Sequence, residues 1–141
     1  MSFDLSGVVE MKRRFQAMKD ADKLTQAAGR GLFGLANRIV TAAKLETPVG
    51  GPPYSPNDKA PGTLRASEYA AAPLIEGTRV SVTLGAGGAA SDYAQVQHEH
   101  GEFRHHVGKS HFIKDPFDQL APTGLADVRD AVAQHLKEAS A

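Results

Sequence analysis

A stretch rich in proline and glycine, residues 46–67 (ETPVGGPPYSPNDKAPGTLRAS), constrains the fold of this chain most. It holds five of the eight prolines and three of the fourteen glycines. Proline donates no backbone hydrogen bond and drives the residue before it toward extended geometry, so the stretch interrupts regular structure. It is also longer than an ordinary connection within a compact domain, which predicts either a functional arm or a disordered linker.

Length and composition favour one globular domain, residues 1–141, with a modest core. The chain has 41% hydrophobic and 23% charged residues, a balance typical of globular proteins. It has no cysteine, which excludes disulfide scaffolds, thiolate metal sites and cysteine nucleophiles. No apolar run approaches the ~18 residues that a membrane-spanning helix needs, and the N-terminus shows no secretory signal. We therefore expect a soluble protein with no membrane partner.

The charge balance argues against nucleic-acid binding as the main task, because 16 basic residues offset 16 acidic ones. The charge is nevertheless uneven along the chain. Residues 1–47 carry eight Lys/Arg and five Asp/Glu (+3), and residues 48–141 carry eight and eleven (−3). Opposite charges would help identical subunits meet head to tail, but small fluctuations on solvated faces explain the same difference.

Two amphipathic helices are predicted before the arm. Over residues 4–19, apolar side chains recur on one helix face: Val8, Met11, Phe15 and Met18. Residues 22–45 repeat the pattern more strongly, and Pro48 ends this second helix. Its glycines indicate either close approach of another backbone, from a strand or a subunit, or a loose helix start. These glycines are Gly29, Gly31 and Gly34.

A small, mostly antiparallel sheet is predicted after the arm. Residues 68–74 and 78–84 should form two strands around a turn at Glu76-Gly77, because apolar and polar residues alternate in the second. Residues 85–90 should form a flexible turn. Residues 92–98 fit either a strand or a short helix.

A short strand at residues 111–113 and a C-terminal helix at residues 123–138, with Thr123 as its N-cap, complete the prediction. Aromatic side chains of the second half should pack in the core: Tyr69, Tyr93, Phe103, Phe112 and Phe117. The order of elements predicts an α+β domain. It has two N-terminal helices, a small antiparallel sheet, a Pro/Gly-rich arm at residues 47–66 and a C-terminal helix.

A histidine-rich run, HEHGEFRHHVGKSH, is the one feature that resembles a chemical site. Imidazole and carboxylate groups are common ligands of zinc, nickel and copper. The spacing matches no ligand motif with a known mechanism, so a polar loop that happens to be rich in histidine explains the run equally. The candidate ligands are His98, His100, His105, His106 and His111.

Catalytic motifs are otherwise missing from the sequence. It contains no GxSxG nucleophile elbow, and its glycine run at residues 85–90 lacks the spacing of a phosphate-binding loop. The residues therefore give no positive indication of a catalytic site or of a bound cofactor.

Four separated motifs follow one another along the chain. They are Thr47-Pro48-Val49, residues 62–67 (GTLRAS), Tyr93-Ala94 followed by His98-Glu99, and residues 111–116 (HFIKDP). Together they resemble the neck, or tail-completion, proteins of long-tailed bacteriophages, a tail-component family that includes relatives of the lambda tail protein Z. The likeness extends over residues 22–138. Two departures are an insertion at residues 51–61, with loss of an aspartate, and a longer histidine-rich run.

The resemblance implies a structural virion protein, without enzymatic activity and without a cofactor, that forms a homo-oligomeric ring in the neck. Its partners would be the head connector or stopper and the tail terminator or tail-tube proteins. DNA would pass through the lumen without sequence-specific binding, and the protein would occupy the host cytoplasm during assembly. A stiff arm loses little entropy when it lies on a neighbour, so we expect it to contact other subunits. The expected contact residues are Pro48, Val49, Tyr54, Pro61, Leu64 and Arg65, with Arg65 paired to an acidic group.

Other functions remain open at this stage. A tail terminator or a minor capsid component of the same particle would share this size and architecture. A small histidine-rich metal-binding protein or metal-dependent enzyme is the alternative of another class.

Overall fold

The computed structural model describes residues 21–49, 61–90, 93–101 and 107–139, together with Met11, Arg13 and Gln16. The first predicted helix therefore lies outside the described residues, apart from those three helical positions. The elements follow the order α2 (Ala21–Glu46), α3 (Thr63–Ala66), β1 (Glu68–Ala70), β2 (Leu74–Glu76), β3 (Arg79–Ser81), β4 (Leu84–Ala86), η1 (Gly88–Ala90), α4 (Ala94–Glu99) and α5 (Lys114–Ala139). This is the predicted α+β class.

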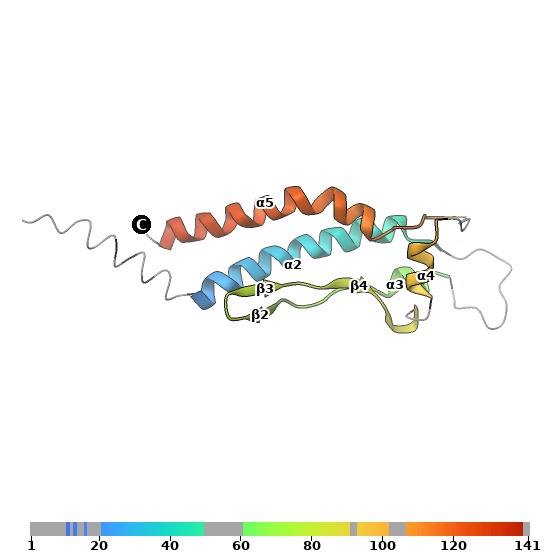
Figure 1. The fold of residues 1–141 in the computed structure, drawn as a ribbon, viewed down its shortest axis with the longest axis horizontal. Coiled ribbons are helices and arrows are strands. Elements are labelled where there is room, and N and C mark those ends of the chain that lie inside the picture. Colours follow the sequence, from blue (N-terminus) through green and yellow to red (C-terminus); the bar gives the residue numbers. More distant parts are fainter. Residues whose placement is uncertain are drawn as a thin grey trace, which may run out of the picture.

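Helix α2 is the central element of the described fold. It packs against α5 on one side and against the four strands on the other (Figure 1). Its apolar face is buried at Leu35, Ala36, Ile39, Val40 and Ala43. The helix ends before Pro48 as predicted, because a proline disfavours helical geometry in the residue that precedes it.

The strands form one long antiparallel hairpin with a bulge in its middle. Ala70 pairs with Leu84 and Leu74 pairs with Ser81, so residues 71–73 lie opposite only residues 82–83. The one-residue excess is a β-bulge, and it contains Pro73, which donates no ladder hydrogen bond and is tolerated at such positions. Gly77 (φ +61°) begins the two-residue turn, as in type II′ hairpins.

Two of the three helix glycines allow close packing, although against side chains of the hairpin and of α5 and not against another backbone as predicted. A Cβ at Gly29 would lie 3.1 Å from Pro73 Cβ, and a Cβ at Gly31 would lie 3.3 Å from Val128 Cγ1 on α5. Gly34 has nothing near it. On α5, a Cβ at Gly124 would overlap the Leu35 side chain. Glycine thus lets α2 approach both of its neighbours closely.

The C-terminal helix begins nine residues earlier than predicted and includes Pro122. Thr123 is therefore an interior residue and not an N-cap. Pro116 lies in the first turn, where its missing N–H costs nothing, and Pro122 is an exposed interior residue at which α5 is expected to bend. Contacts with α2 keep the helix continuous through this proline.

Three smaller predictions were also wrong. Residues 111–113 form a turn and not a strand, because His111 has a positive φ of 55°. Residues 84–86 belong to β4, so the flexible turn is shorter than expected. Phe112 is fully buried, but Phe117 and Tyr69 are each 46% exposed, and Phe103 lies outside the described residues.

For residues 92–98 the sequence allowed a strand or a short helix. Residues 94–99 form a short helix, α4.

Candidate functional site

The end of α2 is held by a segment that comes from near the start of α5. Val49 N donates to Val107 O (3.2 Å), and Lys109 N donates to Glu46 O (2.8 Å). Gly108 lies between these bonds with φ +86°, and a Cβ there would lie 2.5 Å from Glu46 O and from Thr47 C. Only glycine fits at this close approach of two backbones.

A buried polar cluster lies beside this junction. Thr47 is fully buried and Glu68, the first residue of β1, is 5% exposed. The Thr47 hydroxyl lies within hydrogen-bond reach of Ala43 O (2.7 Å) and of Glu68 Oε1. Arg65 Nη2 donates to Thr47 O at 3.2 Å. The cluster thus ties α2, α3 and β1 together.

Burial and the neighbouring groups act in opposite directions on the titration of Glu68. Burial raises the pKa of Glu68, while the hydrogen bond that the Thr47 hydroxyl donates to Glu68 Oε1 and the charges of Lys44 and Arg65 oppose the rise. Because a threonine hydroxyl has one hydrogen, Thr47 donates either to Ala43 O or to Glu68 Oε1 at any moment.

A lysine bridges two carboxylates at the edge of the junction. Lys109 Nζ lies 3.3 Å from Glu46 Oε2 and 2.9 Å from Asp115 Oδ2. The hydrogen bond from Lys109 lowers the pKa of Asp115, and its two acceptors raise the pKa of Lys109. These groups are substantially exposed, so they orient the junction more than they stabilise it.

The predicted contact residues of the arm differ in burial. Pro48 and Leu64 are buried within this chain, and Leu64 packs with Ala90, Ala94 and Phe112. Val49 and Arg65 are half-buried at the junction, and Arg65 lies close enough to Glu68 to lower its pKa without forming an ion pair. Pro61 is exposed. Tyr54 lies outside the described residues.

Three of the candidate ligand histidines, His98, His100 and His111, make contacts within the fold. Lys114 N, in the first turn of α5, donates to His98 Nε2 at 3.2 Å, so the His98 side chain caps that helix. Its ring meets those of His111 and Phe112 edge to face, with centroids 5.6 and 5.1 Å apart. Ser110 Oγ donates to His100 O at 3.0 Å.

The structure describes three of the five candidate metal ligands, His98, His100 and His111. No group of three or more His, Cys, Asp or Glu side chains within the described ranges is arranged to hold a metal ion. His105 and His106 lie outside those ranges.

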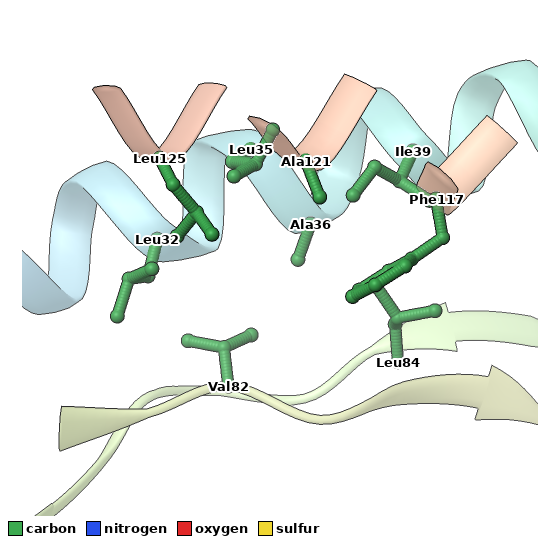
Figure 2. Close-up of a pocket in the computed structure, with 9 residues that line it drawn as sticks. All are labelled: Leu32, Leu35, Ala36, Ile39, Val82, Leu84, Phe117, Ala121 and Leu125. Carbon is green, nitrogen blue, oxygen red and sulfur yellow. The ribbon is translucent and has the colours of Figure 1, made fainter. Parts of the chain in front are cut away.

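An apolar groove between α2, α5 and the hairpin was not predicted (Figure 2). Its volume is about 90 Å³. Its lining side chains are Leu32, Leu35, Ala36, Ile39, Val82, Leu84, Phe117, Ala121 and Leu125. The helical periodicity of α2 predicted which of its side chains face the core. The groove also needs side chains from the hairpin and from α5, and no local sequence pattern indicates that these three elements meet.

The chain has no counterpart among the proteins it was compared with. Neither protein-family models nor curated proteins nor solved structures gave a match. Within the described residues, no helix has the length and apolar character to cross a membrane. The junction and the groove are therefore interpreted from their own geometry.

Proposed function

We propose that this chain is a structural virion protein of a long-tailed bacteriophage, which forms a ring in the neck and joins the head connector to the tail. Its partners are copies of itself, the connector or stopper above and the terminator or tail-tube proteins below. The role requires neither catalysis nor a cofactor.

The observation that carries the proposal is that the four motifs of the resemblance meet at one end of α2. Arg65 of the second motif donates to Thr47 O of the first. Leu64 of the second packs with Ala94 of the third and Phe112 of the fourth. Residues widely separated in the sequence thus serve one packed unit, which supports a shared fold over a coincidence of short motifs.

The described residues on both sides of residues 50–60 contact this unit. Val49 forms a β-bridge with Val107, and Leu64, which follows residues 50–60 by four positions, is 4% exposed. An arm whose two ends are fixed loses less entropy on binding a neighbour than a free one. This anchoring supports a role for the arm in subunit contact.

The hairpin supplies a second means of association. Among the described strands, β1 pairs only with β4 and β2 only with β3, so each keeps an edge with unpaired backbone groups. Such an edge can accept a strand or an extended segment of a neighbouring subunit.

A nonsense codon at Leu24 in the phage gene tests the proposal. Electron microscopy of the lysate should show filled heads beside unjoined tails of normal length, and a host that suppresses the codon should restore complete particles. Over-long tails would identify a terminator instead, and defective heads would identify a minor capsid component. Normal infectious particles without the chain would overturn the structural role.

The alternative of another class, a metal-binding protein or enzyme, has its own test. Stoichiometric metal retained by the purified protein after dialysis, and lost in His100→Ala, would support it. We expect no retained metal.

A further inference from the structure

The apolar groove is open to solvent along one side. Phe117 is 46% and Leu125 50% exposed, although both side chains point into the groove from α5 (Figure 2). Leu32 and Ile39 form its floor, seven residues or roughly 10 Å apart along α2. Exposed apolar surface of this kind favours a protein partner.

The groove does not have the properties of a small-molecule site. All nine lining residues are apolar, so no polar side chain would orient a ligand. Small-molecule sites typically enclose several hundred Å³, and this volume of about 90 Å³ holds only a few side-chain groups. The groove is therefore suited to the apolar face of another helix.

The N-terminal segment of the chain has a matching face. In residues 4–19 the last three apolar positions of that face, Met11, Phe15 and Met18, span seven residues. On a helix they would extend roughly 10 Å, the length of the groove floor. The segment has four basic and two acidic residues (+2), and α5 has three basic and five acidic residues (−2), so their charges are complementary.

The structure favours a second copy over the same chain as the source of this helix. Met11 is helical and 55% exposed, so its side chain does not occupy the groove of its own chain.

We propose that the apolar face of residues 4–19 of one copy docks in the groove between α5 and the hairpin of a second copy. Donor and acceptor are different surfaces, so each copy can give one helix and receive one. Such head-to-tail contacts close into a ring or extend into a filament. The inference rests on the proposed function only for ring closure, since the contact itself concerns two copies of this chain.

The absence of cysteine allows a direct test with the full chain. Met11→Cys and Leu125→Cys are made as separate single variants carrying different affinity tags, mixed and oxidised. We expect disulfide-linked mixed dimers. Leu45→Cys is the control for the second position, because Leu45 is 78% exposed and lies at the far end of α2.

The yield of mixed dimer should be several-fold higher with Leu125→Cys than with Leu45→Cys. Equal yields at millimolar protein would overturn the proposal. A double variant, M11C with L125C, separates the two topologies. If it forms a disulfide within one chain at low protein concentration, the helix docks in its own chain and the proposal fails.

A second pair of variants measures the contact without cysteine. Met11→Asp should weaken self-association in sedimentation by roughly tenfold or more, because it would bury a charge in an apolar groove. Gln16→Asp adds the same charge away from the apolar face and should leave association unchanged. Equal effects of both would overturn the proposal.

The outcome is separable from that of the proposed function. Mixed dimers together with normal particles from the nonsense phage would keep the contact and remove the neck role. Unjoined tails without mixed dimers would keep the neck role and remove this contact.

Discussion

At the scale of single residues, Gly108 shows how one missing side chain allows two segments to lie side by side. It combines a positive φ of 86° with backbone atoms of residues 46–48 at 2.5–2.6 Å from an added Cβ. Gly62 has nearly the same φ, 83°, but nothing within 4 Å. The two glycines thus differ in crowding and hardly in φ.

Alanine substitutions should separate these two contributions. Gly62→Ala should cost about 1–2 kcal/mol from the left-handed backbone alone. Gly108→Ala should cost at least about 1 kcal/mol more, because the crowding atoms belong to backbone that cannot move aside. Urea unfolding measures both. Equal losses would show that residues 107–109 do not lie against the end of α2.

Glu68 predicts a pH dependence of stability. Burial raises its pKa in the folded protein, so the folded state binds this proton more tightly than the unfolded chain does. The stabilisation is complete below the pKa of the unfolded chain and is lost as the pH rises through the higher pKa of the folded protein.

Glu68→Gln removes this titration and keeps an acceptor and a donor near Thr47. The free energy of unfolding of the variant, relative to that of the natural protein, should be higher at about pH 7 than at about pH 4, as measured by urea unfolding. The same difference at both pH values would mean that burial does not raise the pKa of Glu68.

The sequence predicted some of these residues and missed others for a physical reason. Pro48 ends α2 as expected, because proline acts on its immediate neighbours. Glu68 was not singled out, since a glutamate at the start of a strand is usually exposed and its burial depends on Thr47 and Arg65 arriving from other elements. Contact roles for Pro48, Val49 and Arg65 remain predictions.

At the scale of elements, the glycines of α2 offer a comparison within one helix. Gly34→Ala should raise stability by about 1 kcal/mol, because the position is exposed and alanine favours the helix. Gly29→Ala gains the same helix propensity, but its methyl group would lie 3.1 Å from Pro73 Cβ in the bulge, which is closer than most Cβ contacts. Its net effect should be smaller or destabilising.

Thermal unfolding of the two variants tests this difference. A similar gain in both would mean that the hairpin can move away from α2 without loss. In that case close packing would not explain the glycine at position 29.

Local patterns predicted the elements they control and failed where tertiary contacts decide. The period of α2 was strong enough to give that helix. The alternation of residues 78–84 identified strand character, but the single predicted strand is divided into β3 and β4 at residues 82–83. The start of α5 was missed because the N-cap was predicted at Thr123, while its contacts with α2 keep it helical from Lys114. The bulge was missed because it depends on register between two strands.

At the scale of the whole molecule, one helix organises the described fold. The hairpin covers one flank of the apolar face of α2, and α5 covers another (Figure 1). The open strip between them is the groove. An isolated copy thus leaves apolar surface that a second copy can bury, which agrees with a chain whose proposed working form is an assembly.

Electron cryo-microscopy of the neck in purified particles of the phage, with mass spectrometry of the same sample, tests the neck role of this chain. We expect a ring between connector and tail, into whose subunits residues 21–49, 61–90 and 107–139 fit. Complete particles that contain no copy of the chain, with every neck subunit assigned to other proteins, would contradict it.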